Sequence, residues 1–202
     1  MFGLNPSEIK ILKKLNTPIK IQNFLDTLPI NFEKHSETYM SVRRTLQAKT
    51  AHCFEGALIA AAALMLAGKK PLLLDLKTLD GDDHVVALYQ VNGYWGAISK
   101  TNHTALRFRD PIYENIHELA LSYFHEYIGP NNGKKTLYAY SLPFNLKQFK
   151  NEWLVSDQEL FHIAEAIDEV DHYELYPESQ KKFIRKADTM ERRGATLTEW
   201  KD

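Results

Sequence analysis

Residues 53–67 constrain the fold most, because they are rich in alanine and leucine and run without a charge from position 56 to Gly68. Apolar residues lie nearly all round such a helix, so it is buried on most sides rather than laid on a surface. Gly68 is placed as its C-cap residue. At about twelve residues the apolar run is too short to span a bilayer. We expect a central helix wrapped by other elements.

After Gly68 the apolar residues no longer recur every 3.6 residues, as in a helix, but every second residue, as in a strand. Residues 71–76, 84–91 and 94–99 predict three strands, and Asn92-Gly93 predicts a two-residue hairpin turn between the last two. Residues 135–141 predict a fourth strand. Asp110-Pro111 is interpreted as a turn.

Helices are predicted on both sides of this segment. Helical spacing and capping residues favour four helices before residue 150: 7–15 with Ser7 as cap, 17–28, 41–46 and 114–128. From about residue 151 the chain is polar and poor in strands, with helices predicted over 156–170 and 178–193. We therefore divide it into a core, residues 1–150, and a C-terminal helical extension, residues 151–202.

Composition narrows the classes of function. The 202 residues carry a net charge of −1, which offers no basic surplus for nucleic-acid binding. A single cysteine excludes an intrachain disulfide and any multi-cysteine metal centre. The N-terminus lacks a signal-peptide pattern, so we expect a cytoplasmic protein with no membrane contact and a reduced thiol. The sequence does not determine the oligomeric state.

Cys53, the only cysteine, stands where the buried helix begins. The N–H groups and dipole of a helix N-terminus stabilise a thiolate, and a neighbouring imidazolium would lower the thiol pKa further. The same N–H groups could stabilise an oxyanion. Gly56 would leave one side of the helix free for substrate. The alternative is an inert thiol buried in an alanine-rich helix.

His84 is the best histidine partner, because it is a polar residue at the start of an apolar strand. His52 adjoins Cys53, but neighbours in a helical first turn point in different directions. If Asn92-Gly93 forms a two-residue turn, Ser99 lies on the face that carries His84. Asn102 would reach that face only through a bulge or at the strand end.

These segments resemble the transglutaminase-like superfamily. The resemblance rests on residues 52–57, on His84-Val85-Val86 and on residues 93–99, Gly-Tyr-Trp-Gly-Ala-Ile-Ser. It covers about a third of the chain, residues 45–105, and extends to a bacterial subgroup of that superfamily. It implies an α+β, papain-like fold in which the cysteine helix packs on a small antiparallel sheet.

The resemblance also implies roles for residues. Cys53 matches the nucleophile and His84 the base, while the aspartate position of the family falls on Ser99. A serine cannot offset the charge of an imidazolium, so either Asn102 substitutes, or the site is a dyad, or activity has been lost. No cofactor is implied, and no calcium-loop pattern is visible.

Three functions stay open. The first is a cysteine-dependent acyl transfer on a peptide or protein amide, with Trp95 and Tyr39 as candidate substrate-binding residues. The second is a catalytically inactive module that binds a protein or peptide through the same cleft. The third, a zinc site built from His52, Cys53, His84 and Asp83, lacks a compact ligand spacing.

Overall fold

Helix α4 (Cys53–Leu66) is buried along almost its whole length in the computed structural model, which describes residues 2–202. Every side chain from Phe54 to Leu64 is buried, so the helix has no solvent face over these three turns. The expectation of a central, enclosed helix is confirmed. Its two ends are half-buried, at Cys53 and at Met65 and Leu66.

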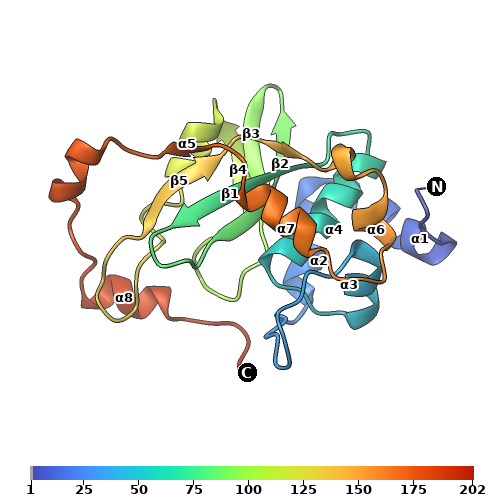
Figure 1. The fold of residues 1–202 in the computed structure, drawn as a ribbon, viewed down its shortest axis with the longest axis horizontal. Coiled ribbons are helices and arrows are strands. Elements are labelled where there is room, and N and C mark those ends of the chain that lie inside the picture. Colours follow the sequence, from blue (N-terminus) through green and yellow to red (C-terminus); the bar gives the residue numbers. More distant parts are fainter. Residues whose placement is uncertain (1) are drawn as a thin grey trace.

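Short helices and the sheet enclose α4 (Figure 1). The helices that contact it are α1 (Pro6–Lys14), α2 (Pro18–Thr27), α3 (Val42–Ala48) and α6 (Glu152–Val155). Thr17 and Ser41 cap α2 and α3. Asn5, and not the predicted Ser7, caps α1, because the Asn5 side chain accepts the N–H of Glu8 at 2.9 Å.

The sheet is antiparallel and has seven strands, in the order β4-β3-β2-β1-β5-β7 with β6 beside β1. The strands are β1 (Leu72–Thr78), β2 (His84–Val91), β3 (Tyr94–Ile98), β4 (Arg109–Tyr113), β5 (Leu137–Ser141), β6 (Phe144–Asn145) and β7 (His172–Glu174). The fold is therefore mixed α+β. Strands β1 and β2 contact α4, and the opposite face of the sheet packs against α5 (Ile116–Leu121) and residues 123–127.

The hairpin register agrees with the sequence prediction. Val91 pairs with Tyr94, and Leu88 pairs with Ala97, as a two-residue Asn92-Gly93 turn requires. Both turn residues have positive φ, 51° and 88°, the conformation of a type I′ turn. This register brings the start of β2, with His84, to the end of β3, with Ser99.

Three strands were not predicted: β4, the two-residue β6, and β7. Asp110-Pro111, expected to be a turn, lies inside β4, and proline is tolerated there because β4 is an edge strand. Residues 172–174 form β7, which pairs with β5 and continues the sheet. The C-terminal extension is therefore not wholly helical.

Helices predicted in the second half are shorter than expected. The ranges 114–128 and 156–170 contain α5 and α7 (Phe161–Asp168). The range 178–193 is two elements, a 3-10 helix (Glu178–Phe183) and α8 (Thr189–Ala195), and a further 3-10 helix spans Leu146–Phe149. Residues after 150 share the core of α4, since their buried side chains join its cluster: Trp153, Leu154, Leu160, Ile163 and Ile167.

Gly56 faces the segment that follows β3 rather than open space for a substrate. A Cβ atom at this position would lie 2.4 Å from the Cβ of Lys100, whose side chain is 2% exposed. The absence of a side chain therefore lets α4 approach Lys100 directly, one turn from Cys53.

We predict that Gly56→Ala destabilises the protein by about 1–2 kcal/mol, because overpacking costs more than the gain in helix propensity. Urea unfolding would measure the change in free energy. Gly194→Ala is the matched control, since no atom lies within 4 Å of an added Cβ in α8. Equal stability of the two variants would contradict the close packing at Gly56.

Candidate active site

The chain enters α4 through a short contact with residues 29–31. Ala51 donates its N–H to the carbonyl of Pro29 at 3.1 Å, and Asn31 donates to the carbonyl of Ala51 at 3.2 Å. These bonds fix His52 as the N-cap residue and Cys53 as the first helical residue. The sulfur thus lies in the first turn, where unpaired N–H groups favour an anion.

Glu55 ties this helix start to the loop of residues 30–40. Its fully buried carboxylate accepts the backbone N–H groups of His52 at 3.0 Å and Met40 at 3.3 Å. It also accepts the Asn31 amide at 3.2 Å and the Thr38 hydroxyl at 3.1 Å. The sequence predictions omit Glu55, although the His52-x-x-Glu55 spacing is that of a capping box.

His84 is held by Ser99, as the hairpin register predicted. His84 Nε2 lies 2.7 Å from Ser99 Oγ, and Ser99 Oγ donates its proton to the carbonyl of Leu106. The hydroxyl must therefore accept a proton from Nε2, which assigns the neutral ring its Nε2–H tautomer. Nδ1 is then the unprotonated nitrogen of the neutral ring, and His84 and Cys53 line the same cavity.

Gln22 of α2 fixes Ser99 in turn. Its side-chain oxygen accepts the Ser99 N–H at 3.0 Å, and its amide donates to the Ser99 carbonyl at 2.8 Å. This buried pair of bonds replaces a strand partner just beyond β3. Nothing in the local sequence pattern distinguishes Gln22 from other polar residues of the helix.

His52 also affects the pKa of the thiol, although the two residues are neighbours whose side chains were expected to point in different directions. As the N-cap residue, His52 has an extended backbone, with φ −93° and ψ −171°, instead of helical angles. His52 and Cys53 consequently line the same cavity, where the imidazole affects the pKa of the thiol. Two imidazoles, from His52 and His84, therefore border one sulfur.

This environment stabilises a thiolate. Burial would raise the pKa of Cys53, but hydrogen-bonding and charge interactions with the neighbouring imidazoles, His52 first, lower it to about 5. Burial would lower the pKa of His52, but the hydrogen bond to Cys53 and the charges of Cys53 and Glu55 raise it to about 9. Between these values the site contains a thiolate and an imidazolium.

Two cavities reach Cys53. The larger cavity, about 660 Å³, lies between the loop of residues 33–39, the turn of residues 81–83 and α7. The smaller cavity, about 260 Å³, is lined by His84, Ile30 and residues 100–103. Cys53 therefore lines both cavities, which also share Asp82 and Asp83.

The larger cavity is acidic. Its lining includes seven carboxylates: Glu33, Glu37, Asp75, Asp82, Asp83, Glu165 and Asp168. His52 is the one basic side chain among the described residues that line it. Such a lining attracts cationic groups and repels anions.

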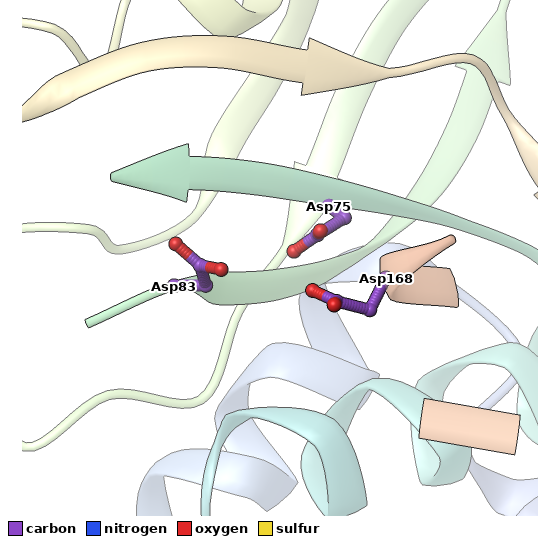
Figure 2. Close-up of side chains that lie close together, drawn as sticks. All are labelled: Asp75, Asp83 and Asp168. Atoms are coloured by element: carbon purple, nitrogen blue, oxygen red, sulfur yellow. The ribbon is translucent and has the colours of Figure 1, made fainter. Parts of the chain in front are cut away.

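Three of these carboxylates lie close together (Figure 2). Oxygen atoms of Asp75, Asp83 and Asp168 all lie within 4.8 Å of one another. The ammonium of Lys77 contacts all three, at 3.0 Å from Asp83, at 3.8 Å from Asp75 and directly against Asp168. A lysine therefore neutralises the position that a cation would take.

The structure separates the remaining predicted site residues. Asn102 lines the smaller cavity, but its side chain makes two hydrogen bonds, of 3.0 and 2.8 Å, with the backbone of Trp200. Tyr39 lines the larger cavity, with its hydroxyl 2.7 Å from Glu37. Trp95 pairs with Gln90 near the hairpin turn and lines neither cavity.

Comparison with known proteins leaves the family open. No protein-family model matches the chain, and no curated protein shows significant sequence similarity to it. Within residues 2–202, none of the helices combines the length and apolar character needed to cross a membrane.

We predict that Lys77→Met lowers the free energy of unfolding by about 1–3 kcal/mol at pH 7, because three adjacent carboxylates lose their shared cation. Chemical denaturation would measure the loss, with exposed Lys10→Met as the matched control. Added calcium should restore part of the stability of the variant only. A wild-type protein stabilised equally by calcium would contradict the assignment of Lys77 as the resident cation.

Proposed function

We propose that the protein is a cysteine-dependent acyl-transfer enzyme that acts on an amide bond of a peptide or protein. The observation that carries this proposal is the Cys53 thiol in the first turn of α4, which shares one cavity with His52 and another with His84. The lowered thiol pKa supports it, because the thiolate is the nucleophilic form.

The resemblance to transglutaminase-like enzymes supports the same proposal. A buried cysteine helix packed on an antiparallel sheet, with histidine at the start of β2, is the arrangement that the resemblance implies. Peptidase, amidase, deamidase and transglutaminase activities share this chemistry. The near-neutral net charge and the acidic larger cavity give no support to a nucleic-acid substrate.

The residues have distinct roles in the proposed reaction. The Cys53 thiolate attacks the carbonyl carbon, and the backbone N–H of Cys53 can stabilise the oxyanion. The carbon–nitrogen bond then breaks, and the leaving nitrogen takes a proton from an imidazolium beside the sulfur. His84 removes a proton from the water or amine that attacks the thioester, and Cys53 departs as a thiolate.

A second candidate is a binding module that retains the cleft without catalysis. It is favoured by Ser99, which offers His84 a hydroxyl where the family has a carboxylate. Such a module needs the shape of the cavities but no reactive thiol, so thiol chemistry separates the two candidates.

We predict that p-nitrophenyl acetate acetylates Cys53 in a burst of about one p-nitrophenolate per chain, because a thiolate attacks activated esters. Slow release of acetate should follow, and His84→Ala should slow that release by about 10²–10⁴-fold by removing the base. Absorbance would report the burst, and mass spectrometry would place the acetyl group.

Two variants complete this test. Cys53→Ala should abolish the burst, whereas exposed His162→Ala should leave burst and release unchanged. If ester cleavage is equal in wild type and Cys53→Ala, the binding module is the better description.

A further inference from the structure

The thiolate needs a cationic partner, and the surroundings of His84 are poorly suited to hold that charge. The outer nitrogen of His84 meets only the Ser99 hydroxyl, whose proton is committed to the Leu106 carbonyl. Among residues 2–202, no ion pair joins His84 to a carboxylate. A neutral acceptor orients the ring but does not offset an imidazolium charge.

His52 has the opposite surroundings. Its Nε2 lies 2.7 Å from the carbonyl oxygen of Thr38, which requires a proton on that nitrogen. The same atom lies 3.5 Å from the buried carboxylate of Glu55 and 3.9 Å from that of Glu33. In the transglutaminase-like pattern a carboxylate pairs with the strand histidine. In this chain the carboxylate lies beside the N-cap histidine instead.

Other charged groups around His52 reinforce this asymmetry. The loop of residues 33–39 adds Glu37, which is bonded to Tyr39, and the segment before α7 adds Glu159. Glu159 is itself paired with Arg44 at 2.6 Å, so it contributes little net field. Glu55, the nearest of these carboxylates, therefore dominates, and it favours the charged ring.

We propose that His52 is the imidazolium that pairs with the Cys53 thiolate in the resting site, and that His84 serves as the neutral base. This division of roles rests on the proposed function for its catalytic consequence. The charge assignment itself concerns the free protein and can be tested without a substrate.

The proton transfers balance under this assignment. The thiolate attacks the amide carbon, and His52 gives its proton to the nitrogen as the carbon–nitrogen bond breaks, leaving a thioester and a free amine. His84 takes a proton from water through Nδ1 while the water oxygen bonds to the thioester carbon. The carbon–sulfur bond then breaks, the acid leaves, and the proton on His84 passes to His52.

Nitrogen-15 NMR of the histidine rings in the intact chain tests the assignment directly. At pH 7.5 the His52 ring should show two protonated nitrogens and remain so until about pH 9, whereas His84 should show one protonated nitrogen, Nε2. Spectra of His52→Gln and His84→Gln assign the signals. A neutral His52 beside a charged His84 would overturn the proposal.

The thiolate absorbance near 240 nm, measured against Cys53→Ser, gives a second test. His52→Gln keeps a donor for Thr38 but removes the charge, so it should raise the Cys53 pKa by about two units. His84→Gln should raise it by less, and exposed His35→Gln should not change it. A larger shift in His84→Gln overturns the inference but leaves the proposed enzyme intact. An ordinary thiol pKa in the wild type overturns both.

Discussion

The burial of α4 is the constraint on which the rest of the structure depends. A helix without a solvent face must be covered on every side, so α1, α2, α3, α6 and the sheet are arranged around it (Figure 1). Its alanines let the neighbours pack closely, and Gly56 lets Lys100 pass against it. Because all sides are closed, the helix is half-open only at its two ends, and the N-terminal end bears Cys53. The site is therefore a consequence of how the core is enclosed.

Two groups of residues determine the charges around the start of α4. Glu55 collects donors from the loop of residues 30–40 and fixes the N-cap, which directs His52 toward the sulfur. The hairpin brings His84 to Ser99, which Gln22 of α2 holds by its backbone. The N-terminal helices thus support the strand histidine, although the resemblance covers only residues 45–105. A carboxylate lies beside His52 and a neutral hydroxyl lies beside His84. The first environment favours a charged imidazole and the second does not, although both rings border the same thiol.

Much of this arrangement could be predicted from local patterns. The enclosed helix, the β2–β3 hairpin and its register follow from periodicity and from Asn92-Gly93, and these placed Cys53, His84 and Ser99 correctly relative to the helix and strands. Features that depend on distant segments could not be predicted this way. Strand β7 forms by pairing with the edge of β5. The Asn102 side chain is hydrogen-bonded to Trp200, about a hundred positions later in the chain. The orientation of His52 depends on its extended N-cap backbone, which a helical-wheel view of adjacent residues ignores.

The central claim is that Cys53 is an activated nucleophile, and the rate of its alkylation by iodoacetamide against pH tests that claim most directly. The lone cysteine gives an unambiguous signal in the intact chain. Because the pKa of Cys53 is lowered to about 5, the rate should reach its plateau by about pH 6 and stay level through pH 8. A rate that is negligible at pH 6 and rises only near pH 8.5, as for an ordinary thiol, would contradict the account.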